Sequence, residues 1–310
     1  MDSGNIGFVM ICAALVFFMT PGLSCFYGGL VRRKNAVNTM FTSVVTIATG
    51  IVMWMLFGYS LSFGPDHGGV IGDFSWFGLE GVSLTEPYIE GQGIPNMVFC
   101  LFQMMFAVIT PALITGSVAG RMKFKSLFTF LVLWSFVVYY PMAHMVWGDG
   151  GFLAKIGSVD FAGGNVVHIS SGITALTLCI LLGKRYDYKR ANYKIHNTPM
   201  VALGAFILLF GWFGFNAGSA LAADGLAAHA FVTTAVSSAA AMLSWMFCDV
   251  VVNKKPTFVG ACTGMVAGLV GITPGAGFVP VWAALIIGLT TSPICFFMIS
   301  WVKEKFGYDD

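Results

Sequence analysis

Apolar stretches long enough to cross a membrane recur along this chain, separated by short polar segments. A helix needs roughly 20 apolar residues to span the hydrocarbon of a bilayer, and an open sheet cannot satisfy its backbone polar groups there. The stretches also lack the alternation of apolar and polar residues that is typical of membrane β-barrels. They predict nine transmembrane helices, at about 7–30, 36–63, 95–119, 126–147, 161–182, 199–220, 227–252, 257–272 and 279–302.

The composition supports an all-α, polytopic membrane protein. Of the 310 residues, 57% are hydrophobic and only 10% are charged, and the mean hydropathy of +0.82 is far above that of a soluble domain. No basic segment precedes the first apolar stretch, so we expect a true span there rather than a cleaved signal. The seven cysteines lie in apolar stretches without CxxC spacing, which indicates core residues rather than metal ligands or disulfides.

The basic residues predict the orientation of the chain. Fifteen of the sixteen lysines and arginines lie in alternate connections, and Lys155 lies on the other side. By the positive-inside rule, the fifteen face the cytoplasm and the N-terminus lies outside. Because these residues flank spans, the net charge of +2 does not indicate nucleic-acid binding. The fifteen are Arg32, Arg33, Lys34, Arg121, Lys123, Lys125, Lys184, Arg185, Lys189, Arg190, Lys194, Lys254, Lys255, Lys303 and Lys305.

Two features of the pattern indicate an inverted repeat within a single domain, 1–310. The first span, FVMICAALVFFMTPGLSCFYGGLV, and the sixth, MVALGAFILLFGWFGFNAGSAL, share an aromatic part followed by small residues. An offset of five spans makes the two copies cross the membrane in opposite directions, as in many transporters. The expected repeats are 7–182 and 199–302. Glycine-rich patterns within the spans predict close packing between helices.

The segment DFAGGNVVHISSG, which begins at Asp160, places two ionisable residues at the start of the fifth span. We expect Asp160 to cap free backbone amides there, to orient the loop, and to present a negative site to a cation. His168 lies about 12 Å deeper, and Ser171, Gly172 and Ala175 follow it on the same helical face. A histidine at this depth is a candidate functional residue that faces a cavity; the alternative is a core histidine satisfied by a nearby hydroxyl.

Aromatic side chains provide a further candidate site. Phe106 lies in FQMMFAVITP, Trp147 ends the fourth span, and Trp212 and Phe215 lie in GWFGFNAGS. A tryptophan and a phenylalanine beside a hydroxyl such as Ser219 would form a cation–π site for a small onium ion. Such an ion donates hydrogen bonds, which potassium cannot do. The alternative for Trp147 is a place in the aromatic belt at the membrane surface.

The other histidines are interpreted structurally. His144, near the external end of the fourth span, is expected to pack or to tether a loop. His67, His196 and His229 are expected in loops. An intramembrane enzyme built on Asp160, His144 and His168 is a weaker hypothesis, because the sequence has no HExxH, no GxSxG and no second carboxylate at depth.

Five motifs in order, FQMMFAVITPALITG, AHMVWG, DFAGGNVVHISSG, GWFGFNAGS and GLVGITPGAGFV, resemble the ammonium transporter family, the Amt/Mep/Rh proteins. The resemblance covers the whole chain and favours the Amt branch, because Trp147 suits a cation site. It implies an eleven-helix inverted-repeat (5+5+1) fold and a homotrimer in the cytoplasmic membrane, with a separate pore in each subunit. The implied substrate is ammonium or ammonia, with methylammonium as an analogue, and no cofactor or metal is implied.

The same resemblance implies roles for individual residues and a partner. It assigns recruitment to Trp147, Phe106 and Ser219 with support from Asp160, a gate to Phe106 and Phe215, and the pore to His168, Trp212 and Thr273. The implied mechanism is that ammonium loses a proton at the entrance and crosses as ammonia. A PII signalling protein is the implied regulator at the cytoplasmic face.

One departure from the family pattern concerns the end of the sequence. Family members have eleven spans, with a second pore histidine in the tenth, in a stretch such as FGVHG. These 310 residues end before such a stretch, so we expect a fragment or a truncated gene that lacks the partner of His168. Two alternatives of the same fold stay open, an ammonium sensor with a fused signalling domain and an Rh-like gas channel.

Overall fold

A computed structural model describes residues 1–188, 190 and 194–309, and Lys189 of the basic set lies outside them. Within these residues, nine helical segments are long and apolar enough to cross a membrane, which confirms the nine predicted spans to within a few residues at most ends. The first five are Ser3–Leu30 (α1), Arg33–Phe63 (α2, Arg33–Met53, and α3, Tyr59–Phe63), Asn96–Val118 (α4, Asn96–Ile114), Phe124–Lys155 (α5, Phe124–Trp134; α6, Tyr140–Trp147; α7, Phe152–Lys155) and Gly164–Leu182 (α8, Ser170–Leu182).

The remaining spans follow the same pattern. They are Thr198–Ala220 (α9, Thr198–Ala217), Gly225–Asn253 (α10), Phe258–Gly275 (α11, Phe258–Ile272) and Val281–Phe306 (α12, Val281–Phe297, and α13, Lys303–Phe306). Strand structure in the described residues is limited to a short hairpin, β1 (Asp66–His67) paired antiparallel with β2 (Ile71–Gly72). His229, expected in a loop, lies instead in the first turns of α10, and its Nε2 lies 2.8 Å from the carbonyl oxygen of Val279.

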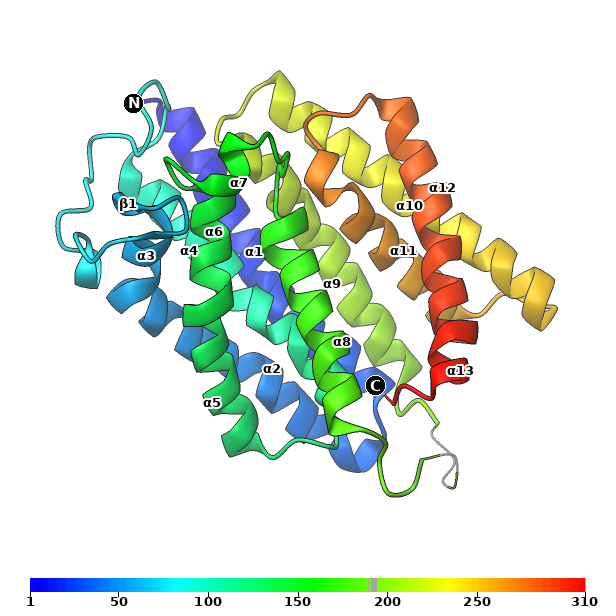
Figure 1. The fold of residues 1–310 in the computed structure, drawn as a ribbon. Coiled ribbons are helices and arrows are strands. Elements are labelled where there is room, and N and C mark those ends of the chain that lie inside the picture. The colour runs from blue at the N-terminus through cyan, green and yellow to red at the C-terminus, as the bar shows by residue number, and fades with distance from the viewer. Residues whose placement is uncertain (189, 191–193, 310) are drawn as a thin grey trace.

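The bundle has two ends that carry different connections. The end that holds the N-terminus also holds the long loop between α3 and α4, which contains the hairpin, and we call it the N-terminal face (Figure 1). The opposite end holds the C-terminus and the connections rich in lysine and arginine, and we call it the basic face. All basic connections therefore lie on one side of the bundle, as the orientation argument requires.

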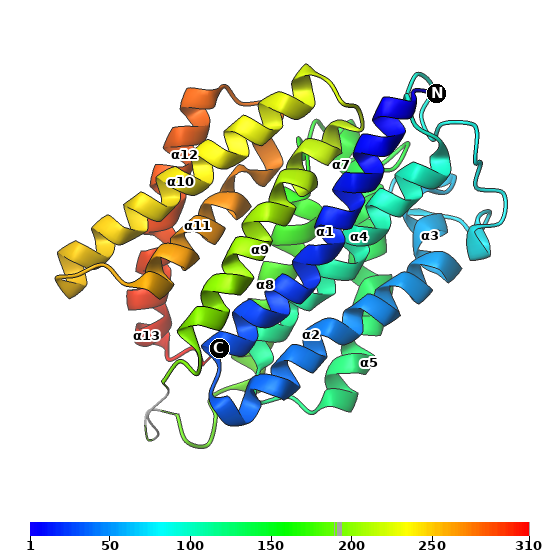
Figure 2. The same cartoon turned by 180° about the vertical axis from the view of Figure 1, so that it is seen from behind.

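Helices α1 and α9 lie side by side through the middle of the bundle (Figures 1 and 2). Glycines make this approach close: a Cβ built on Gly204 would lie 2.3 Å from the backbone nitrogen of Phe26, and one on Gly29 would lie 2.7 Å from the nitrogen of Val201. The same holds for α12 against α10, where a Cβ on Gly288 would lie 2.2 Å from the carbonyl oxygen of Ser237. The prediction that small residues serve close helix packing is confirmed.

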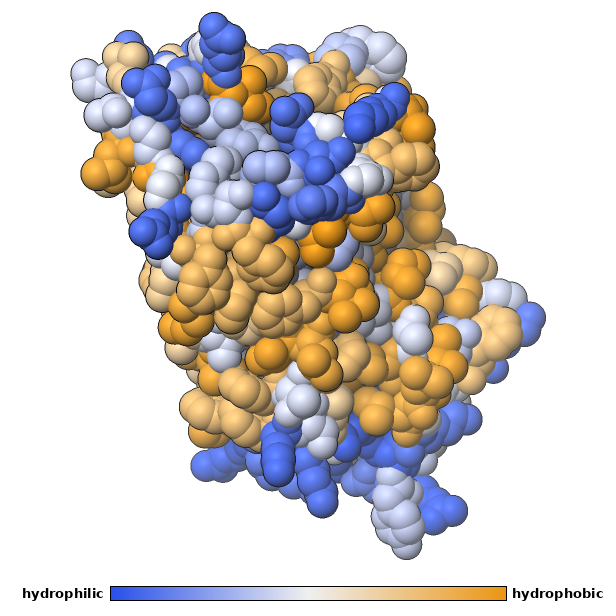
Figure 3. Space-filling model, turned by 60° about the vertical axis from the view of Figure 1, so that its left-hand side comes forward, coloured by the Kyte–Doolittle hydropathy of each residue, from blue (hydrophilic) through white to orange (hydrophobic). Residues whose placement is uncertain are grey.

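The surface shows an apolar belt between two polar ends (Figure 3). Large apolar side chains are exposed along the spans, for example Leu133 and Val137 on the α5–α6 segment and Ile173 and Leu181 on α8. An exposed apolar surface of this size would be unfavourable in water, but it matches the hydrocarbon core of a bilayer.

Candidate functional site

Asp160 caps the helical segment that carries His168. Its Oδ1 accepts hydrogen bonds from the backbone amides of Gly163 (2.7 Å) and Gly164 (2.6 Å), and its Oδ2 from those of Asn165 (2.7 Å) and Val166 (3.2 Å). The first amides of a helix have no acceptor within the helix and form its positive end, so one carboxylate satisfies four donors. The predicted capping role is confirmed, although the helical segment begins at Gly164, three residues later than predicted.

The glycines after Asp160 are required by the backbone and by packing. Gly163 has φ of +125°, which is in the region that side chains rarely allow, and a Cβ on Gly164 would lie 2.5 Å from Cβ of Pro274. The turn that follows, Gly164–Ile169, is π-helical, a form often found at functional sites. Asp160 and the glycines together therefore set the position of His168.

Trp147 is attached to the same capping segment. Its indole Nε1–H donates to the carbonyl oxygen of Asp160 at 2.9 Å. Its ring meets that of Phe106 edge-on, with centroids 5.8 Å apart and planes at 73°. Asp160 thus contacts Trp147 through its backbone carbonyl, while its carboxylate accepts from the amides, and the residue as a whole is 9% exposed.

A column of aromatic rings continues from Trp147 into the bundle. The centroids of Phe106 and Phe215 lie 4.5 Å apart, and both side chains are 1% exposed. The His168 ring stacks on Phe215 at 5.8 Å and 17° and on Trp212 at 5.3 Å and 23°. The structure therefore brings together five of the residues that the sequence singled out, in the order Trp147, Phe106, Phe215, His168 and Trp212.

Ser219 and Thr273 join the column through hydrogen bonds. The Ser219 hydroxyl donates to the carbonyl oxygen of Phe215 at 2.9 Å, so its lone pairs stay available as acceptors. Thr273 Oγ1 accepts the indole N–H of Trp212 at 2.9 Å and donates to the carbonyl oxygen of Leu269 at 2.7 Å. Thr273 is fully buried, and its bond to Trp212 links it to the ring that stacks on His168.

Below the rings, His168 borders a large cavity. The cavity has a volume of about 1200 Å³ and is also lined by Ser171, Gly172 and Ala175, which confirms that these small residues share the face of His168. It extends to basic-face residues that include Arg185 and Lys303. Nε2 of His168 is buried and has no hydrogen-bond partner among the described residues, so a hydroxyl does not satisfy it as the core alternative requires.

Two buried amides near the rings were missed by the sequence analysis. Asn216 follows Phe215, is fully buried, and donates from Nδ2 to Thr234 Oγ1 at 2.8 Å. Its Oδ1 and the Oε1 of buried Gln103 have no hydrogen-bond partner in the described part of the chain. Gln103 lies three residues before Phe106, about one helical turn away. This spacing from a candidate gate residue is the sequence signal that could have identified it.

The rim of the cavity on the basic face is held by arginines. The Arg121 guanidinium donates to the carbonyl oxygens of Gly183 (2.6 Å), Cys179 (3.3 Å) and Ser117, and so satisfies acceptors at the end of α8. Arg185 forms an ion pair with Asp309, in which the Asp309 side chain is buried and that of Arg185 is partly exposed. Burial of Asp309 opposes ionisation, but the hydrogen bonds and charge of Arg185 outweigh it and hold the pKa of that carboxyl below its usual range.

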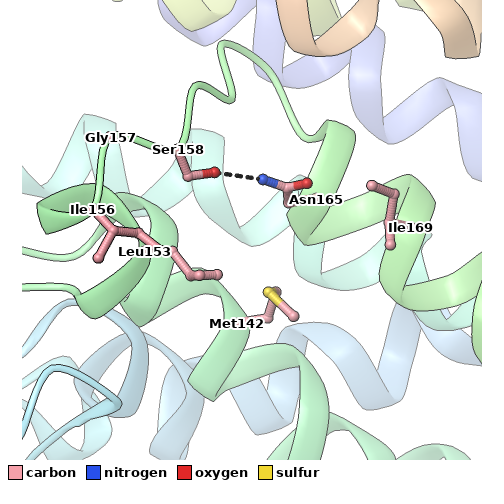
Figure 4. A pocket seen from close by; sticks show the side chains of 7 residues that line it. All are labelled: Met142, Leu153, Ile156, Gly157, Ser158, Asn165 and Ile169. Atoms are coloured by element: carbon pink, nitrogen blue, oxygen red, sulfur yellow. Dashed lines mark hydrogen bonds between the residues drawn. The ribbon is translucent and has the colours of Figure 1, made fainter.

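A smaller pocket lies apart from the aromatic column. It has a volume of about 400 Å³ and lies between α7 and the segment that begins α8, where Asn165 Nδ2 donates to Ser158 Oγ at 2.9 Å (Figure 4). No charged side chain of the described residues lines it. Its lining is mostly aliphatic, from Met142, Leu153, Ile156 and Ile169, so it does not suit a cation.

His144 has the tethering role that was predicted. Its buried ring contacts the carbonyl oxygen of Ser62 and the carboxylate of Asp66 in the loop at the N-terminal face. His144, Asp160 and His168 therefore have different partners, and the described residues contain no group of three histidines, cysteines or acids placed to hold a metal.

Comparison with known proteins gives consistent matches along the chain. A family model described as Ammonium Transporter Family matches residues 7–310. A protein of Bacillus subtilis named ammonium transporter is 48% identical over 310 residues, which are all of this chain and 76% of that protein. The crystal structure of Candida albicans Mep2 has a TM-score of 0.92 and 34% identity, covering 100% of this chain and 69% of that one. A structure titled Sensor Amt Protein has a TM-score of 0.91 and 28% identity, covering 99% and 77%.

Proposed function

This chain belongs to the ammonium transporter family, and we propose that it recruits ammonium at Trp147, removes a proton, and conducts ammonia past His168. It is a multi-pass membrane protein, and its named relatives are transporters rather than enzymes. The observation that carries the proposal is the aromatic column, which links the N-terminal face to a cavity on the opposite side through one histidine.

Recruitment is supported by the groups around Trp147. The ring faces of Trp147 and Phe106 attract a cation electrostatically, and the free lone pairs of Ser219 accept an N–H from it. A potassium ion has no N–H to donate, and a single hydroxyl oxygen replaces little of its hydration shell, so we expect this site to favour ammonium. Asp160 supports the site by holding the Trp147 indole, and its buried negative charge adds to the attraction of a cation.

The closed rings of Phe106 and Phe215 explain why a proton must be removed. Carrying an ammonium ion through an apolar constriction costs on the order of tens of kcal/mol in the limit of no solvation. If ammonium has an acidity near that of a lysine ammonium, with a pKa of about 10, transfer of its proton to water at the N-terminal face costs only about 4 kcal/mol at neutral pH. Neutral ammonia is therefore the species that passes the two rings.

His168 supplies the hydrogen-bonding group beyond the gate. Its Nε2 is buried without a partner among the described residues, and the ring borders the cavity, so an ammonia molecule can form a hydrogen bond with it. Trp212 stacks on the ring and is itself fixed by Thr273, which keeps the imidazole in one orientation. His168 thereby provides a hydrogen-bonding group in an otherwise apolar passage.

The placement in the cell and the assembly follow the family. We place the N-terminal face outside the cytoplasmic membrane and the basic face inside, in line with the positive-inside rule. The chain forms one transport domain whose repeats, 7–182 and 199–302, meet where α1 packs on α9. The functional unit is a homotrimer with one pore per subunit, and the basic face is the surface that a PII signalling protein would bind.

The test compares His168→Ala with Trp147→Ala in methylammonium uptake by vesicles that contain the protein as the cell makes it. We expect the His168 variant to lose flux or selectivity against other ions, and the Trp147 variant to raise KM while keeping its maximal rate. Unchanged transport in His168→Ala would contradict the proposed role of the histidine. Ser171→Ala, on the same cavity wall, is the matched control and should leave flux unchanged.

The likeness to a protein titled Sensor Amt Protein favours a second candidate, an ammonium sensor of the same fold. A sensor would bind ammonium at Trp147 and change conformation without appreciable flux. Saturable methylammonium binding in purified protein, combined with no uptake above that of empty vesicles, would favour the sensor over the transporter.

A further inference from the structure

The histidine three residues before Trp147 is fully buried and bonded on both sides. Nδ1 of His144 lies 3.1 Å from the carbonyl oxygen of Ser62, and Nε2 lies 3.0 Å from Oδ1 of Asp66. A carbonyl and a carboxylate both accept, so each contact is a hydrogen bond when the ring nitrogen that faces it carries a proton. The ring thereby joins α6 to Ser62 at the end of α3 and to Asp66 in β1.

Asp66 is well suited to such a pair. The hydrogen bond from His144 is the main cause that holds the pKa of Asp66 below its usual range, and the Gly69 amide and the Lys155 ammonium act in the same direction against partial burial. The Gly69 amide donates to Oδ1 at 2.6 Å, and Lys155 Nζ lies 3.8 Å from Oδ2. The carboxylate thus joins the hairpin loop to α6.

The same loop also holds the chain on the far side of Trp147. The backbone amide of Phe152, five residues after Trp147, donates to the carbonyl oxygen of Gly69 at 2.7 Å. His144 and Phe152 are therefore both fastened to the segment Asp66–Gly69, and the stretch that contains Trp147 runs between the two attachments. Figure 1 shows β1 of this loop beside the end of α6.

We propose that Asp66 and His144 are positioning residues for ammonium recruitment, because their pairing fixes the end of α6 from which the Trp147 ring projects. Without it, Trp147 keeps the indole bond to Asp160 but loses the support of its backbone. Its ring then samples orientations away from the cation. This inference rests on the proposed function, since it assigns the loop to the recruitment step of that transport.

The experiment measures methylammonium uptake as a function of concentration for Asp66→Ala and for Asp73→Ala. Asp73 lies in the same loop, and its carboxylate accepts from the amide and hydroxyl of Ser75. Both variants remove one negative charge from the N-terminal face, and only Asp66→Ala removes the tie to α6. We expect Asp66→Ala to raise KM roughly three- to tenfold, the size of one weakened cation–π contact, at an unchanged maximal rate.

Asp66→Asn provides the rescue, because an amide oxygen can accept from both His144 and Gly69. Its KM is expected to lie between those of the wild type and Asp66→Ala. A wild-type KM in Asp66→Ala, or an equal rise in Asp73→Ala, would overturn the inference, the second because charge alone would then explain the effect. Absence of saturable uptake in the wild type would instead overturn the proposed function, so the two failures are distinguishable.

If Asp66→Ala does not fold, His144→Met tests the same pairing from the other side. Methionine fills similar space and has no donor for Asp66 or for Ser62, so a folded His144→Met protein with raised KM and an unchanged maximal rate supports the proposal. The same protein with a wild-type KM contradicts it.

Discussion

Replacing Asp160 with asparagine tests how the segment before His168 is built. The carboxylate accepts four backbone amides, two on each oxygen, at distances of 2.6 to 3.2 Å. An asparagine side chain keeps one oxygen and replaces the other with an NH₂ group, which donates and cannot accept. Two of the four amides are therefore left without a partner at a residue that is only 9% exposed.

The expected loss follows from these two bonds. A hydrogen bond to a charged acceptor contributes about 1.5 to 3 kcal/mol, so losing two costs about 3 to 6 kcal/mol. With an unfolding entropy of about 2.1 cal/mol/K per residue, each kcal/mol lowers the melting temperature of a 310-residue chain by about 1.5 °C, so we expect a fall of about 5 to 9 °C. The indole bond of Trp147 to the Asp160 carbonyl should loosen with the turn, so KM for methylammonium should rise as well.

The assay is thermal unfolding in detergent with a thiol-reactive dye, which reports buried free cysteines such as Cys12 and Cys100 as they become exposed. Asp224→Asn is the matched control, because Asp224 is exposed and caps α10 through a single bond to the Ala227 amide, a role that asparagine fills equally well. Equal melting temperatures for the two variants would refute the argument that the four-bond cap holds this segment.

Two further predictions concern groups that the packing brings together. Thr273→Val should lower the free energy of unfolding by about 1 to 3 kcal/mol, because it leaves the buried indole N–H of Trp212 without an acceptor. Thr263→Val is the control, because it removes only a bond to Val259 within the same helix. Equal melting temperatures of the two variants would contradict the role of the Trp212 bond. The pKa of Asp309 is lowered in the folded protein, so its pairing with Arg185 should stabilise fully above its unfolded pKa of about 4 and be lost as the pH falls below that value. A double-mutant cycle on Arg185 and Asp309 should show coupling at pH 6 that decreases as the pH falls below about 4, and coupling that is independent of pH would contradict this.

Much of the fold was legible in the sequence because its signals are local. The length of an apolar run fixes whether a helix can cross a membrane, and all nine predicted spans were found in the described residues. The cap by Asp160 acts within six residues of the chain, and the shared face of His168, Ser171 and Ala175 follows from helical periodicity. The grouping of Trp147, Phe106 and Phe215 was predicted through the family resemblance rather than from spacing.

Other parts of the site depend on contacts between distant segments. The bond between Trp212 and Thr273 joins residues 61 apart, and that between Asp66 and His144 joins residues 78 apart. Nothing local distinguishes Asp66 from Asp73 in the same acidic loop, and the buried amides of Gln103 and Asn216 were not recognised beside their aromatic neighbours.

Local stretches of sequence predict which segments enter the bilayer and which residue caps the helix that carries the histidine, because hydrophobic length and backbone capping operate over one helix. The packing of the helices sets which rings meet, which carbonyl accepts from the Trp147 indole, and which carboxylate pairs with His144 on α6. These pairings exist because glycine-mediated close packing fixes the relative heights of helices far apart in the chain, and no single span encodes those heights.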